Sequence, residues 1–157
     1  MFRITDICAI ALQIEQNGEL TYHQASQIAI DPEISRLFEW MAAEERGHVQ
    51  WFQQFSDDRP LPSGNEDLEA MGRNLLQEMI AKETFSLDQD QLVKTENLSE
   101  LLEQSINFEQ DTILFYSFLS SLIEDAQTVT QLDEIISEEK KHVEILNQML
   151  SDITKAQ

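Results

Sequence analysis

The feature that most constrains the fold is an internal repeat, in which the chain matches itself without gaps at a separation of 94 residues. The repeat pairs Glu15-Gln16 with Glu109-Gln110, Glu44-Glu45 with Glu138-Glu139, His48-Val49 with His142-Val143, and also Leu20 with Leu114, Tyr22 with Tyr116, Ser26 with Ser120 and Asp31 with Asp125. Most of the shared residues are polar and lie on otherwise apolar stripes, where a generic helical hairpin would not need them. We therefore expect two similar helical hairpins.

Apolar residues recur at helical spacing through most of the chain, which has only four glycines and three prolines to interrupt helices. Asp31 and Asp125 are predicted to cap the second and fourth helices, and Pro32 suits a first helical position. The spacing predicts long helices over about 2–29, 32–56, 98–124 and 126–152.

The fold predicted from this pattern is all-α, an antiparallel four-helix bundle. A length of 157 residues suits one domain. The segment after the second helix contains a loop at 57–65, a helical period at 66–81 and a more polar stretch at 82–97. The single domain thus divides into hairpin 1 at about 2–56, a long helical crossover at about 57–97 and hairpin 2 at about 98–153.

Charge and cysteine content exclude several classes of function. The formal net charge of −20 disfavours nucleic acids and anionic membranes as partners, while it attracts cations. The one cysteine, Cys8, excludes an intramolecular disulfide and any Cys-x-x-Cys site. No apolar run approaches the length of a membrane span, and no targeting segment is evident, so a cytoplasmic protein is expected.

Helix geometry places the repeated polar residues at one level of the bundle. Glu15 lies 16 residues before the cap at Asp31, or about 24 Å along the helix. Glu45 and His48 lie about 21 Å and 25 Å beyond the cap, on one face at i,i+3 spacing. The second hairpin repeats these offsets about Asp125 with Glu109, Glu139 and His142. Pairing the hairpins brings together four carboxylates and two imidazoles, a ligand set that suits two cations.

Two further pairs of repeated residues flank these candidate ligands. Tyr22 and Tyr116 each follow a candidate glutamate by seven residues, and helical side chains lean toward the N-terminus. We expect their hydroxyls to hydrogen-bond the ligand carboxylates, Tyr22 toward Glu15 and Tyr116 toward Glu109. Glu44 and Glu138 are repeated too, but they sit about 100° around the helix from the ligands and are expected to be solvated or interhelical.

At these residues the sequence resembles the rubrerythrin family of the ferritin-like superfamily. The similar fragments are IEQNGELTY, AAEERGHVQWF, FEQDTILFY and SEEKKHVEIL. The resemblance implies a di-iron centre, two iron ions per bundle, that reduces hydrogen peroxide with electrons commonly supplied by rubredoxin. It implies six metal ligands, namely Glu15, Glu45, His48, Glu109, Glu139 and His142. It also implies a homodimer, in which helices are exchanged through the long connection in some members.

The sequence departs from the family pattern in two ways. A rubredoxin-like iron site needs four cysteines and this chain has one, so electrons would come from a separate donor. Many rubrerythrins also carry an extra Glu three residues after the third-helix ligand, where this chain has Thr112, with Gly18 as its repeat counterpart. The extra carboxylate is linked to redox-dependent iron movement in the family.

The function expected from these patterns is a non-haem di-iron oxidoreductase that reduces hydrogen peroxide or oxygen. One alternative is ferrous iron oxidation and storage, as in ferritin and bacterioferritin. Arg46 stands where bacterioferritin would have its haem-binding methionine, so no haem is expected. A di-manganese, catalase-like centre is a further alternative, because the ligand types alone do not choose iron over manganese. The last alternative is a helical bundle that binds no metal and serves only in interactions.

Overall fold

The computed structural model describes residues 4–55, 70, 74 and 98–156. Those residues form four long helices, α1 (Ile4–Ile28), α2 (Pro32–Gln54), α5 (Leu98–Leu122) and α6 (Ala126–Ala156). The described residues contain no strand, which confirms the all-α prediction. The predicted crossover at 57–97 lies outside the described residues, apart from Ala70 and Asn74. None of the helices in the described part of the chain combines the length and apolar character that a membrane span requires.

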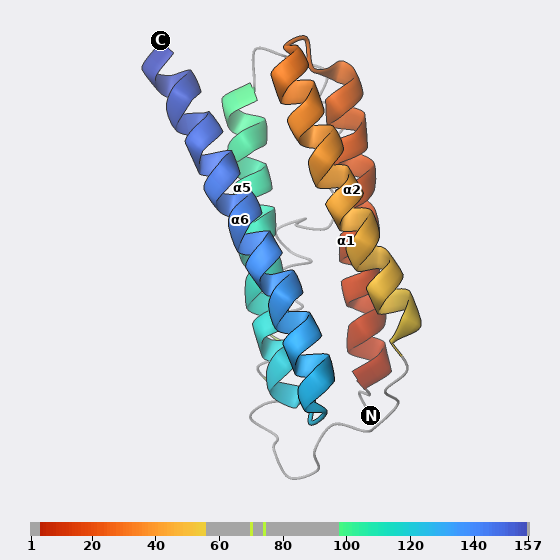
Figure 1. Ribbon diagram of the computed structural model, residues 1–157. Coiled ribbons are helices and arrows are strands. Elements are labelled where there is room, and N and C mark those ends of the chain that lie inside the picture. Colours follow the sequence, from red (N-terminus) through yellow and green to blue (C-terminus); the bar gives the residue numbers. More distant parts are fainter. Residues whose placement is uncertain (1–3, 56–69, 71–73, 75–97, 157) are drawn as a thin grey trace.

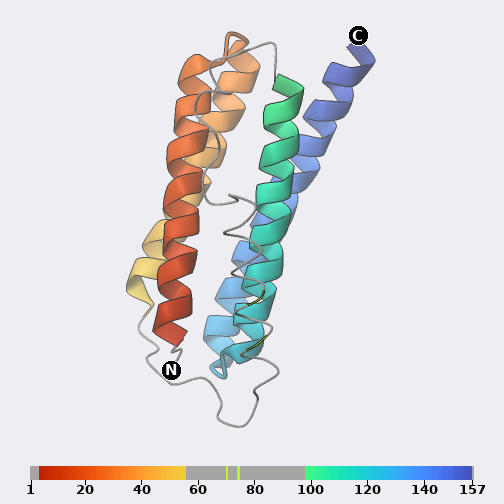
Figure 2. The ribbon, with the colours of Figure 1, turned by 180° about the vertical axis from the view of Figure 1, so that it is seen from behind.

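The helices form two antiparallel hairpins. α1 packs along α2, and α5 packs along α6 (Figure 1). Seen from behind, α1 and α5 run side by side in opposite directions, and this pair joins the two hairpins (Figure 2). Each helix therefore presents one face to its hairpin partner and another to the interior that the hairpins share.

Local capping chemistry sets where α2 and α6 begin. The Asp31 carboxylate accepts a hydrogen bond of 2.9 Å from the Glu33 backbone N–H, with Pro32 opening the helix. Asp125 accepts a 3.0 Å bond from the Thr128 backbone N–H at the start of α6. Both predicted caps are confirmed. Because each cap satisfies an N–H that has no partner within the helix, it fixes the turn of its hairpin and the register of the two helices around it.

Two apolar clusters fill the bundle, one toward each end. The first contains Ile14 of α1, Phe52 of α2, Phe115 of α5 and Ile136 of α6. The second, toward the other end of the bundle, contains Ala25 of α1, Ala42 of α2, Ile106 of α5 and Leu146 of α6. On every helix the predicted metal ligands lie between these clusters, so apolar packing closes the polar site above and below.

Candidate metal centre

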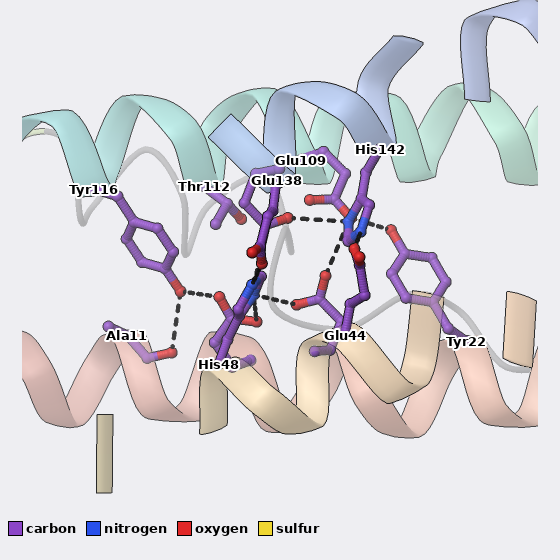
Figure 3. A network of polar contacts seen from close by, with 12 residues as sticks. Ala11, Tyr22, Glu44, His48, Glu109, Thr112, Tyr116, Glu138 and His142 are labelled. Carbon is purple, nitrogen blue, oxygen red and sulfur yellow. Dashed lines mark hydrogen bonds and ion pairs between the residues drawn. The ribbon is translucent and has the colours of Figure 1, made fainter. Parts of the chain in front are cut away.

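The six predicted ligands lie together in one buried cluster. Each of the four helices contributes to it, and all six residues are no more than 4% exposed. Their convergence confirms the register worked out from the two caps, since side chains up to 127 residues apart in sequence meet at one level (Figure 3). The members of the cluster are Glu15 from α1, Glu45 and His48 from α2, Glu109 from α5, and Glu139 and His142 from α6.

The cluster divides into two sets of four that have the geometry to hold a metal ion. In each set, one ligand atom per residue lies within 4.8 Å of all the others. Both sets include Glu45 and Glu139. The first set adds Glu15 and His48, and the second adds Glu109 and His142. The two sets therefore adjoin and share a pair of carboxylates.

Both imidazole rings point the same nitrogen at these carboxylates. Nδ1 of His48 lies 2.8 Å from Oε1 of Glu139 and 3.4 Å from Oε2 of Glu15. Nδ1 of His142 lies 3.1 Å from Oε1 of Glu45 and 3.3 Å from Oε2 of Glu139. Nδ1 is thus the ring nitrogen available to a metal in both halves of the repeat.

The cluster contains buried polar atoms without hydrogen-bond partners, which is costly unless another group satisfies them. These atoms are Glu15 Oε2, Glu45 Oε1, Glu109 Oε2, both carboxylate oxygens of Glu139, and His48 Nδ1. Several are close enough to pair by distance, but they meet outside hydrogen-bond geometry. Carboxylate oxygens and an imidazole nitrogen converging on a shared point are a donor set that divalent iron or manganese accepts. The residues present therefore fit a two-metal site.

The two tyrosines hydrogen-bond ligand carboxylates, but not the ones we predicted. The Tyr22 hydroxyl of α1 donates to Oε1 of Glu109 on α5 at 2.6 Å. The Tyr116 hydroxyl of α5 donates to Oε1 of Glu15 on α1, also at 2.6 Å. The prediction that each phenol leans toward the glutamate of its own helix was wrong. Seven residues span about 10.5 Å of one helix, so each phenol instead reaches the antiparallel helix packed against it.

Burial and mutual repulsion disfavour the charged form of most of the carboxyl groups. Burial raises the pKa of Glu45 well above its usual value, and the charges of Glu15 and Glu109 raise it further. Burial and neighbouring carboxylates likewise raise the pKa values of Glu109 and Glu139. The pKa of Glu15 is lowered, because hydrogen bonds from its neighbours and the charge of His48 outweigh the effect of burial. Protons and a bound cation would therefore compete for the same carboxylate oxygens.

The histidines respond in the opposite sense to the same surroundings. Burial alone lowers the pKa of His48, but the nearby carboxyl groups of Glu139, Glu15 and Glu45 reverse the effect and raise it. His142 behaves alike, with Glu109, Glu139 and Glu45 raising its pKa above the ordinary value. The carboxylates that could share a metal with each ring therefore also favour its protonated form, so a proton and a metal would compete for Nδ1.

Glu44 and Glu138 are interhelical, which was one of the two outcomes expected for them. Oε2 of Glu138 on α6 lies 2.6 Å from Nε2 of His48 on α2. Oε2 of Glu44 on α2 lies 2.5 Å from Nε2 of His142 on α6. Both glutamates therefore contact Nε2, whereas Nδ1 of each ring faces the carboxylate cluster (Figure 3).

The positions where the sequence departs from the family pattern carry neutral groups beside the cluster. Thr112 is 1% exposed, and its hydroxyl donates to the Phe108 carbonyl of its own helix at 2.8 Å. A Cβ at Gly18 would lie 3.4 Å from Oε2 of Glu45. The Arg46 side chain is exposed, and its Nε donates to Oε1 of Glu19 at 2.8 Å.

Comparison with known proteins agrees with this architecture. A crystal structure from Thermotoga maritima, described as that of a candidate ferritin-like diiron-carboxylate protein, superposes with a TM-score of 0.67. It is 23% identical, and the match covers 96% of this chain and 95% of that one. The bundle is therefore of the ferritin-like class. No curated protein sequence matches the chain.

The family is identified by sequence. The model of the Rubrerythrin family matches residues 6–99, which is more than half of the chain. The chain therefore belongs to the Rubrerythrin family. The match includes Glu15, Glu45 and His48, while the ligands of the second hairpin lie beyond it. The internal repeat connects those later residues to the same pattern.

Proposed function

We propose that this protein is a non-haem di-iron oxidoreductase that reduces hydrogen peroxide, or oxygen, with electrons from a separate donor. The observation that carries the proposal is the pair of buried four-residue sets that share Glu45 and Glu139. Carboxylates shared by two adjoining sets are what we would expect of residues that hold a pair of metal ions. Glu15 and His48 would complete one iron site, and Glu109 and His142 the other.

The hydrogen bonds of the carboxylates support this division of roles. Glu15 and Glu109 each have one oxygen held by a tyrosine hydroxyl and the other without a partner. Each would therefore offer one oxygen to one metal. Both oxygens of Glu139 lack partners, as suits a carboxylate that belongs to both sets and would help to hold both metals.

The protein environment would supply exclusion of water and control of protons. Bound iron would supply the two electrons that convert one peroxide and two protons into two water molecules. The ligands are buried between two apolar clusters, which limits side reactions with solvent. Burial and the adjoining carboxylates raise the pKa values of Tyr22 and Tyr116, so both phenols keep their protons and remain donors at neutral pH.

Stoichiometry distinguishes this function from the alternatives. Protein loaded anaerobically with ferrous iron is mixed with limiting peroxide, and ferric iron and evolved oxygen are measured. We expect two ferrous ions oxidised per peroxide, without oxygen release, and a rate well above that of the Glu45→Ala/Glu139→Ala variant. Oxygen release by a manganese-loaded sample would indicate the catalase alternative. Continued uptake of iron far beyond two ions per chain would indicate storage.

The proposal extends to the setting of the protein. Because the chain has a single cysteine, it lacks the four thiolates of a rubredoxin-like site, and the electron donor is proposed to be another protein. A homodimer and a cytoplasmic location are proposed from the family resemblance. Sedimentation of the iron-loaded protein tests the dimer directly.

A further inference from the structure

The outer nitrogen of each candidate metal-binding histidine is held by a glutamate from the opposite hairpin. Glu138 of α6 reaches Nε2 of His48 on α2, and Glu44 of α2 reaches Nε2 of His142 on α6, at 2.6 and 2.5 Å. Each contact connects one hairpin to the other (Figure 3), and the two residues of each pair are 90 and 98 positions apart in sequence, respectively. They occupy equivalent positions of the internal repeat, since Glu44 aligns with Glu138.

These contacts determine which ring nitrogen carries a proton when a metal is bound. A carboxylate has only acceptor atoms, so the nitrogen that faces it must be the donor. Nε2 is then N–H in both rings, and Nδ1 is left with the lone pair that a metal needs. Nδ1 is also the nitrogen that faces the shared carboxylates, 2.8 Å from Glu139 in His48 and 3.1 Å from Glu45 in His142.

We propose that Glu44 and Glu138 are positioning residues that fix the orientation and tautomer of His142 and His48 for metal binding. This inference rests on the proposed metal centre and deepens it. A histidine ring turned by 180° about its Cβ–Cγ bond would move Nδ1 out of the cluster. The carboxylate on Nε2 opposes that rotation because the turned ring would lose its outer hydrogen bond. Neither glutamate belongs to the metal-binding sets, and both reach solvent, with side chains 26% and 42% exposed.

Metal affinity tests the positioning role. The variants are Glu44→Ala/Glu138→Ala, the conservative Glu44→Gln/Glu138→Gln, and the control Glu39→Ala/Glu134→Ala. The control removes the same two charges from exposed positions of the same helices. Affinity for Co²⁺ is measured by competition with a chelator. We expect the alanine pair to bind about 10- to 100-fold more weakly, because outer partners of metal-bound histidines typically contribute that much. The glutamine pair should recover most of the affinity, since its amide oxygen still accepts from Nε2.

Proton NMR of the Co²⁺-loaded protein supplies a readout that a general loss of stability would not move. Metal-bound histidines with a protected Nε2–H give shifted, solvent-exchangeable signals, and we expect one from each ring in wild type. The alanine pair should lose both signals to rapid exchange, while the glutamine and control pairs keep them. Helix content by circular dichroism establishes that each variant is folded.

Three outcomes separate the possible failures. If the alanine pair binds Co²⁺ like wild type and keeps both exchangeable signals, the positioning role is wrong although the metal centre stands. If the glutamine pair is as weak as the alanine pair, acceptance of the Nε2 proton is not the cause. If wild type binds neither Co²⁺ nor Fe²⁺, the proposed function itself fails.

Discussion

Replacing the shared carboxyl group Glu45 by glutamine should flatten the pH dependence of stability of the metal-free protein. The Glu45 side chain is buried between both candidate metal sites, and burial raises its pKa well above the usual value. The folded protein therefore keeps a proton on Glu45 at pH values where the unfolded chain, with an ordinary pKa of about 4.5, has released it. Glutamine preserves the shape and removes the titration.

The sign follows from the difference in bound protons between the two states. When the folded state holds one more proton than the unfolded state, the free energy of unfolding falls by about 1.4 kcal/mol for each unit of rising pH. Above pH 6.5 the raised pKa values of His48 and His142 act in the same direction, because the unfolded rings have lost their protons. The lowered pKa of Glu15 acts only below about pH 4.5. Stability should therefore fall steadily from pH 6.5 to 8.5.

Each pH unit over which folded Glu45 keeps its proton and the unfolded chain does not costs wild type about 1.4 kcal/mol of unfolding free energy, and Glu45→Gln should be spared that loss. Urea denaturation of chelator-treated protein at pH 6.5, 7.5 and 8.5 measures both slopes.

Glu39→Gln provides the matched control, because Glu39 is an exposed glutamate on the same helix. Its slope should equal that of wild type. If wild-type stability is flat or rises between pH 6.5 and 8.5, or if Glu45→Gln retains the wild-type slope, the cluster does not store protons as described.

Four single substitutions test the local contacts described above through urea denaturation at pH 7. Tyr22→Phe and Tyr116→Phe should each lower the free energy of unfolding by about 1.5–3 kcal/mol, because each leaves a buried carboxylate oxygen without its 2.6 Å donor; a loss below about 0.5 kcal/mol would contradict this. Gly18→Ala should raise the free energy of unfolding by about 0.5–1 kcal/mol through helix propensity, because a Cβ there would meet Glu45 and Phe108 at 3.4 Å or more. A destabilised variant would mean that these neighbours leave no room for the added methyl group. Asp125→Ala should lower stability by about 1 kcal/mol by removing the cap of α6, and an unchanged value would show that the cap is dispensable.

The fold was predictable because its signals are local. Apolar spacing located all four long helices, and the caps at Asp31 and Asp125 fixed where two of them begin. The ends were harder to place, since α6 continues to Ala156 rather than stopping near 152. A helix end without a strong stop signal depends on how its last turns pack, which the local pattern does not contain.

The convergence of the six candidate ligands was predictable because the rise per residue of an α-helix is constant. Counting residues from each cap placed Glu15 level with Glu45, and the structure brings them into one cluster. The partners of Tyr22 and Tyr116 were not predictable in the same way. Choosing between a carboxylate on the same helix and one on the facing helix requires knowing how α1 and α5 pack.

The contacts of Glu44 and Glu138 were also beyond sequence reasoning, although the internal repeat marked both residues. Their angle on the helix left solvent and a neighbouring helix as equal possibilities. In the structure α2 and α6 approach closely enough for each carboxylate to reach Nε2 of a histidine on the other helix, so both glutamates are interhelical. A repeated polar residue adjacent to a candidate ligand is therefore a useful signal for a group that supports the ligand.

The most direct test of the proposed metal centre is iron content per chain after anaerobic loading with Fe²⁺ and removal of excess metal. We predict about two tightly bound iron ions for wild type, one for each four-residue set, and a loss of that binding in the Glu45→Ala/Glu139→Ala variant. Equal iron retention by wild type and variant, or no retention of either Fe²⁺ or Mn²⁺ by wild type, would contradict the assignment of these residues as a two-metal site.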